Sequence, residues 1–159
     1  CCMTLVTPEG FAPDRWTRRD GDAPLTFSRV IVPLDRLDEA LAAGIDGVGV
    51  ELAADADLGL LLRRLRSLDL IVLRFASFTD GRGFSLARQL RQLAFTGKIR
   101  AAGHVLPDQW AFLRDCGVDE VEIEDGLAER HGEAAWRAAA GAITGSYQRR
   151  LVGARPARA

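Results

Sequence analysis

Five short apolar runs alternate with stretches of helical spacing, and this alternation limits the possible fold more than any other feature of the sequence. The first three runs are rich in Val, Ile and Leu, as buried strands are, and the last two mix apolar with charged residues. The five runs lie at residues 30–32, 48–52, 70–75, 98–102 and 120–124. Apolar residues at the spacing of one helix face predict helices at residues 37–41, 58–68, 84–93, 107–116 and 127–143. Strand and helix units in a row with short connections predict a parallel sheet, and therefore an α/β protein.

Two arrangements of this sheet are open. A complete eight-unit barrel takes about 250 residues. A chain of 159 residues therefore forms either an open, flavodoxin-like doubly wound sheet or a partial TIM-barrel-like sheet. The cadence of successive units, and the position of Glu51, Arg74 and Arg100 near strand ends, favour the partial barrel. In the run 120–124, Val121 and Ile123 alternate with glutamates, which places this strand at a sheet edge or on the polar interior rim of a partial barrel.

The chain divides into an N-terminal arm at residues 1–28, a single α/β domain at 29–147 and a basic disordered tail at 148–159. Prolines, glycines and charged residues in the arm favour an irregular segment, which Phe11 and Trp16 pin to the body. A partial barrel leaves sheet edges with unpaired backbone groups. We therefore expect self-association as a homodimer to be one way of covering them, with the arm contributing.

Composition excludes several classes of function. The formal net charge is −1 and no basic stripe is present, which argues against nucleic acid as a partner. No apolar run reaches membrane-spanning length, so we expect no membrane partner, and the few cysteines without a Cys-x-x-Cys pair fit a reducing cytoplasm. The three cysteines and two histidines have no spacing that suits zinc or an iron–sulfur cluster, so no metal is expected. Cys116 is either a reactive thiol or a small buried residue at a helix end, and the second interpretation is favoured.

Ligands of parallel α/β proteins bind at the loops that follow the carboxyl ends of the strands. In this chain those loops supply a group of charged and hydroxyl side chains that we predict to bind an anion or another small ligand: Arg74, Ser77, Asp80, Arg82, Arg100, His104 and Asp108. The centre of the group is the segment 70–85, which is a strand, a loop with two glycines and the start of a helix. Backbone N–H groups and two guanidiniums can converge there on an anion.

Each of these residues has a functional and a structural interpretation. Arg74 and Arg82 would hold an oxyanion or carboxylate, Asp80 would orient an arginine or accept a proton, and His104 would transfer a proton near neutral pH. Alternatively, Asp80 caps the following helix, Arg82 is solvated and His104 bonds a loop carbonyl. Arg74 directly follows buried strand residues, so a carboxylate such as Glu51 or a bound anion must satisfy it.

The segment Gly81–Leu86 resembles a dinucleotide fingerprint only superficially. Leu86 stands where the third glycine belongs, and the strand that precedes the segment is the third of the chain, not the first. A phosphate-loop lysine motif and a Gly-x-Ser-x-Gly elbow are both missing from the sequence. We therefore expect no bound cofactor.

Three runs, Arg74–Arg88, Arg100–Gln109 and Phe112–Asp119, resemble a bacterial domain-of-unknown-function family, number nine hundred thirty-four in its series. The resemblance spans roughly Arg29–Glu124. It implies an association with assimilatory sulfate and sulfite reduction, because members are commonly encoded beside the sulfite reductase and carry an "oxidoreductase" label. The family pattern favours an Asp where this chain has His104, and it assigns no catalytic residues.

Two functions follow from the residues and the resemblance together. In the first, the protein is an accessory of the sulfite-reducing system that binds a partner enzyme, such as the sulfite reductase, or a small oxyanion at the strand C-terminal loops. In the second, it is an enzyme of sulfur metabolism acting on a small anionic substrate. The accessory is favoured, because electron transfer to sulfite needs a cofactor and the sequence offers no redox group of its own.

Overall fold

The five predicted strands form the parallel centre of one curled sheet. The structure is a computed structural model that describes residues 3–19, 21–25, 28–53, 55–75 and 81–141. The eight strands of the sheet lie in the order β2-β1-β8-β7-β6-β5-β4-β3. The parallel strands are β4 (Arg29–Pro33), β5 (Gly47–Ala53), β6 (Leu70–Phe75), β7 (Lys98–Gly103) and β8 (Glu120–Glu124).

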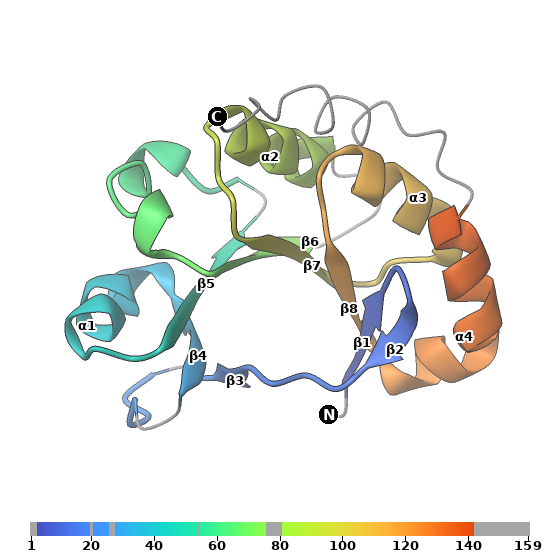
Figure 1. Ribbon diagram of the computed structural model, residues 1–159, viewed down its shortest axis with the longest axis horizontal. Coiled ribbons are helices and arrows are strands. Elements are labelled where there is room, and N and C mark those ends of the chain that lie inside the picture. The colour runs from blue at the N-terminus through green and yellow to red at the C-terminus, as the bar shows by residue number, and fades with distance from the viewer. Residues whose placement is uncertain (1–2, 20, 26–27, 54, 76–80, 142–159) are drawn as a thin grey trace, which may run out of the picture.

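The helices cover the outer face of this sheet, which curls as a half-barrel (Figure 1). They are η1 (Leu34–Arg36), α1 (Leu37–Ala42), α2 (Gly81–Gln92), α3 (Pro107–Asp115) and α4 (Asp125–Gly141), in which Gly132 marks a kink. The predicted partial barrel is therefore confirmed over the open flavodoxin-like sheet, which would carry helices on both faces.

The helix predicted at residues 58–68 is wrong in its form, although four of its leucines are buried as expected. Two short 3₁₀ helices stand in its place, η2 (Leu58–Leu60) and η3 (Leu65–Ser67). The side chain of Asp57 accepts a hydrogen bond from the backbone N–H of Gly59 at 2.8 Å and so caps the N-terminus of η2. The leucines at 58, 61, 65 and 68 are buried and anchor these turns, while Leu62 points to solvent.

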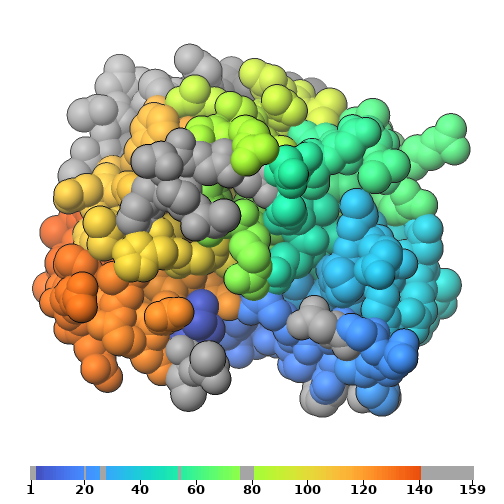
Figure 2. Space-filling model, turned by 180° about the vertical axis from the view of Figure 1, so that it is seen from behind, coloured from blue at the N-terminus to red at the C-terminus, as the bar shows by residue number. Residues whose placement is uncertain are grey.

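The arm also differs from its prediction, because much of it forms regular strands. β1 (Met3–Thr7) and β2 (Gly10–Ala12) make an antiparallel hairpin, and β3 (Thr17–Arg18) pairs in parallel with β4. β1 pairs antiparallel with β8, so the arm covers the outermost parallel strand at each side of the sheet. Figure 2 shows this arm in blue along the lower margin, between the orange C-terminal region and the cyan region of α1. The self-association that we expect from unpaired sheet edges stays a prediction. Its premise is weakened, because strands of the arm pair with β4 and β8.

The turn between β1 and β2 explains why prolines and glycines wrongly predict an irregular segment in the arm. Gly10 adopts φ 124°, which favours glycine. A Cβ at Gly10 would also lie 2.6 Å from Oε1 of Glu133 in α4, so helix and hairpin approach closely there. Turn residues therefore join two strands in this arm, and they do not mark an irregular segment.

The sheet separates two apolar clusters. The larger cluster lies between the strands and the helices and includes Val50, Ile71 and Trp136. The smaller one lies on the opposite face of the strands and consists of Ile31, Leu70, Val72 and Ala102, with Trp16 of the arm packed against it. Phe11 packs against the larger cluster, so Phe11 and Trp16 both pin the arm to the body, as predicted.

β8 lies inside the sheet, between β1 and β7, so its alternating glutamates do not mark an edge strand. Glu120 and Glu122 are buried, and Glu124 is exposed. The alternative prediction, a strand on the polar interior of a partial barrel, is the one that the structure confirms. None of the helices in the described ranges is long and apolar enough to cross a membrane. The predicted basic tail falls at residues outside the described part.

Candidate functional site

Charged side chains from strands on both sides of the half-barrel meet in its interior. Glu51 of β5 accepts from two guanidiniums, with Arg74 Nε at 2.6 Å from Oε1 and Arg18 Nε at 2.7 Å from Oε2. Both terminal nitrogens of Arg18 also donate hydrogen bonds to the carboxylate of Glu122 in β8. Burial alone would raise the pKa of Glu51, but the hydrogen bonds and charges of Arg74 and Arg18 lower it overall. Glu51 is therefore held as a carboxylate.

Arg100 differs from its prediction. It lies within β7 and not in the following loop, and its side chain is fully buried. It donates to three carboxylates, at 2.9 and 3.1 Å to Asp14, 3.0 Å to Glu120 and 3.2 Å to Glu122. Burial on its own would lower the pKa of Arg100, but Asp14 and Glu120 raise it. Arg100 therefore joins the arm to the sheet and is not placed to meet a ligand from solvent.

Sequence reasoning missed the two arm residues that complete this network, Asp14 and Arg18. A signal for them exists in the spacing of Asp14, Trp16 and Arg18, which is the period of two typical of an extended chain with one face inward. All three contact the interior of the half-barrel. The prolines and glycines on either side hid this pattern.

Arg74 is the penultimate residue of β6, and Phe75, which follows it, is buried in the core. The four residues before it, Leu70–Leu73, are fully buried, whereas the Arg74 side chain is 52% exposed. The predicted partner Glu51 is confirmed, and the predicted burial is wrong. The reason is its place in the strand: Arg74 faces the interior side near the rim, where solvent reaches it.

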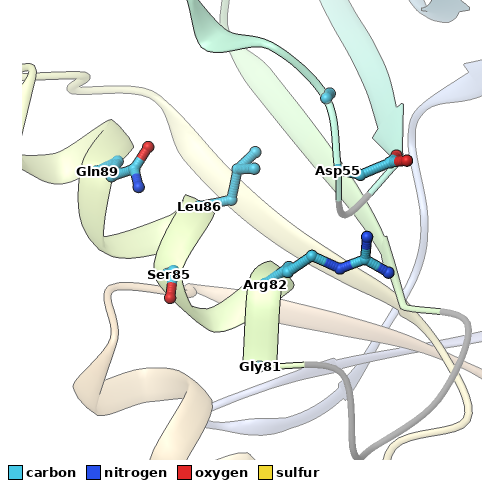
Figure 3. Close-up of a pocket in the computed structure, with 7 residues that line it drawn as sticks. Asp55, Gly81, Arg82, Ser85, Leu86 and Gln89 are labelled. Atoms are coloured by element: carbon cyan, nitrogen blue, oxygen red, sulfur yellow. The ribbon is translucent and has the colours of Figure 1, made fainter.

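Arg82 lies in the first turn of α2 and lines an open pocket. Figure 3 shows its guanidinium extending toward the side of the pocket where the carboxylate of Asp55 also lies. The remaining lining comes from the segment after β5 and from α2: Ala56, Gly81, Ser85, Leu86 and Gln89. One cation, one carboxylate, a hydroxyl and an amide therefore surround a small apolar floor.

The other predicted residues are spread along the same edge of the sheet. His104 follows the end of β7 and is exposed, and Asp108 is exposed in the first turn of α3. Ser77 and Asp80 lie outside the described residues. The structure thus places Arg74, Arg82, His104 and Asp108 at the carboxyl ends of β6 and β7 or in the helices that follow, whereas Arg100 lies deeper, within β7.

The packing beneath this edge fixes how α2 meets β6. A Cβ at Gly83 would overlap the ring of Phe75 at Cε1, so only glycine permits this approach. The ring of Phe84 lies 5.3 Å from that of Phe75 and 4.8 Å from that of Phe112 in α3, measured between centroids. The N-terminus of α2, and with it Arg82, is therefore held against the end of β6.

Cys116 is a free thiol at the C-terminal end of α3, and it is buried. Burial raises its pKa, against a smaller opposing effect of Arg88. The thiol is therefore protonated and enclosed, which confirms the interpretation as a small core residue over a reactive one. In the described ranges, no group of three His, Cys, Asp or Glu side chains is arranged to hold a metal ion.

A sequence profile described as "Bacterial protein of unknown function (DUF934)" matches residues 49–158. The matched region begins in β5 and includes Glu51, Arg74 and Arg82, whereas Asp14 and Arg18 of the arm precede it. No curated protein matches the chain. Because the match covers more than half of the sequence, the chain belongs to the DUF934 family of bacterial proteins of unknown function.

Proposed function

We propose that this protein is an accessory of assimilatory sulfite reduction that binds a small oxyanion at the carboxyl end of β6. The observation that carries the binding part is the 52% exposure of the Arg74 side chain, which lies between the buried residues Leu73 and Phe75 of β6. Arg82, in the helix that follows, brings a second exposed guanidinium to the same edge of the sheet.

Sulfite and sulfate suit such an arrangement chemically. Guanidinium groups donate in a planar fork that matches two oxygens of an oxyanion, and the first turn of α2 adds backbone N–H groups to the same region. Asp55 in the pocket offsets part of the positive charge. The exposed guanidiniums at this edge of the sheet, with Asp55 beside Arg82, therefore favour a small anion over a large polyanion.

The pathway part of the proposal rests on the genomic association that the family resemblance implies. An accessory role is favoured over a catalytic one on chemical grounds. The sequence carries no motif for a redox cofactor, and the one described cysteine is buried with a raised pKa. A purified protein with flavin fluorescence would favour the alternative, an enzyme of sulfur metabolism.

A growth experiment tests this function. A deletion strain is supplied with sulfate, sulfite, sulfide or cysteine as sole sulfur source, and its gene is restored as wild type, Arg82→Ala or Arg130→Ala. Arg130 is a matched control because it is an exposed arginine in α4, away from the pocket residues. We expect poor growth on sulfate and sulfite, normal growth on sulfide and cysteine, and rescue by wild type and Arg130→Ala only. Normal growth of the deletion strain on all four sources contradicts the proposal.

A further inference from the structure

Glu51 is shared between the proposed anion site and the N-terminal arm. Its two oxygens serve different arginines, Oε1 accepting from Arg74 at 2.6 Å and Oε2 from Arg18 at 2.7 Å. Arg74 is 52% exposed, whereas Glu51 is 23% exposed and Arg18 26%. The half-exposed arginine can therefore change partners, and the carboxylate beneath it is the more enclosed group.

This difference in exposure between Arg74 and Glu51 matters when an oxyanion binds Arg74. A guanidinium that turns to a ligand gives up its bond to Glu51, and a partly buried carboxylate without a counter-charge is costly. Arg18 removes this cost, because it remains on the other oxygen of Glu51. Arg18 itself is anchored independently, since both of its terminal nitrogens bond Glu122 and its backbone belongs to β3.

We infer that Arg18 is a positioning residue for the oxyanion site: by holding Glu51, it permits Arg74 to turn from that carboxylate to the bound anion. This inference rests on the proposed function, and it gives the arm a role in ligand binding although Arg18 itself does not contact the anion. It also assigns Glu51 the role of a competitor, because the carboxylate and the ligand both bind Arg74.

Titration calorimetry with sodium sulfate and, under anaerobic conditions, sodium sulfite tests the inference on the full chain. We expect Arg18→Gln to weaken anion binding about tenfold, because Arg74 is then the main partner of Glu51. Glu51→Gln should tighten binding, since the neutral amide competes less for Arg74. The double variant Arg18→Gln/Glu51→Gln should bind like Glu51→Gln, because Arg18 acts through Glu51.

Two further variants separate this role from a general effect on folding. Arg18→Lys keeps a positive charge beside Glu51 and should retain most of the affinity. Arg29→Gln is the matched control, since Arg29 is an exposed arginine on the adjacent strand β4 and lies over the ring of Trp16. If Arg18→Gln does not fold, the tightening by Glu51→Gln and the affinity of Arg18→Lys decide the question.

Unchanged affinity in Arg18→Gln, or an equal loss in the double variant, overturns the inference while leaving the proposed function in place. Anion binding that is lost in Arg82→Ala yet indifferent to Arg18 and Glu51 overturns the inference in the same way. A wild type that binds neither sulfate nor sulfite overturns the proposed function itself, and the inference with it.

Discussion

Asp14 and Arg100 form a two-point ion pair that joins the N-terminal arm to the middle of the sheet. The two bonds measure 2.9 and 3.1 Å, and the arginine is fully buried. The pair joins the arm to β7 in the middle of the sheet. Asp14 belongs to the segment that connects β2 and β3, which are the strands at the two ends of the sheet order. The arm is therefore an integral part of the half-barrel.

Loss of this pair should destabilise the protein moderately. Asp14→Ala removes two charge-assisted bonds but leaves Arg100 its partners Glu120 and Glu122. We expect the free energy of unfolding, measured in urea, to fall by about 1–3 kcal/mol. Asp46→Ala, at an exposed position before β5, should change it by less than about 0.5 kcal/mol. Equal midpoints for Asp14→Ala and wild type would show that the arm crossing does not contribute to stability.

The two interior arginines should differ sharply in their contribution to stability. Arg74→Ala removes a half-exposed partner from a carboxylate that Arg18 still pairs, so we expect a loss of about 0–1 kcal/mol. Arg100→Ala leaves Glu122 paired with Arg18, but among the described residues it leaves the buried Glu120 only Lys98 at 3.8 Å, and a loss of about 3–5 kcal/mol is expected. Chemical denaturation of both variants measures the difference, and comparable losses would refute this division.

Glu51 should contribute to the pH dependence of stability. Its pKa in the folded protein lies below the ordinary value of 4.5, so its contribution is present above that value and is lost as the pH falls through the folded pKa. The difference in unfolding free energy between wild type and Glu51→Gln should therefore shrink from pH about 6 to pH about 3. Urea titrations at both pH values measure it, and a constant or growing difference would speak against a lowered pKa.

Two glycines of α2 offer a matched test of how the helix meets β6. Gly83→Ala places a methyl group against the ring of Phe75, and we expect it to cost about 1–3 kcal/mol. Gly81→Ala, two residues earlier, meets nothing within 4 Å and should be close to neutral. Thermal unfolding of the two variants gives the comparison. Similar melting temperatures would mean that α2 does not approach β6 as closely as the structure shows.

The central half of the fold is predictable from the sequence because β4 to β8 are local signals. β4, β5 and β6 are short, mostly apolar runs bounded by turn residues, and β8 alternates apolar residues with glutamates, so both patterns can be identified locally. The arm is harder to predict because β1 depends on a partner far along the chain: it pairs with β8, more than a hundred residues away. Local composition cannot report such a partner.

The candidate site is predictable in part for a similar reason. The position of Arg74 directly after buried strand residues indicates that it needs an acceptor and names Glu51 as a candidate, whereas Arg100 is predicted only as a ligand-binding residue. Which arginine is buried depends on how the sheet curls and on where the arm crosses it, and neither is visible in the spacing of one strand. Asp14 and Arg18 escape detection because they belong to a segment whose composition is typical of irregular structure.

The melting temperature in the presence of sulfite tests most directly whether the carboxyl end of β6 binds a small oxyanion. A ligand that binds only the native state at about 100 times its dissociation constant stabilises the protein by about 2.7 kcal/mol. We predict that sulfite raises the melting temperature of the wild type and of Arg130→Ala by several degrees and leaves that of Arg82→Ala unchanged. Equal shifts in all three proteins, or no shift in any of them, would contradict the account.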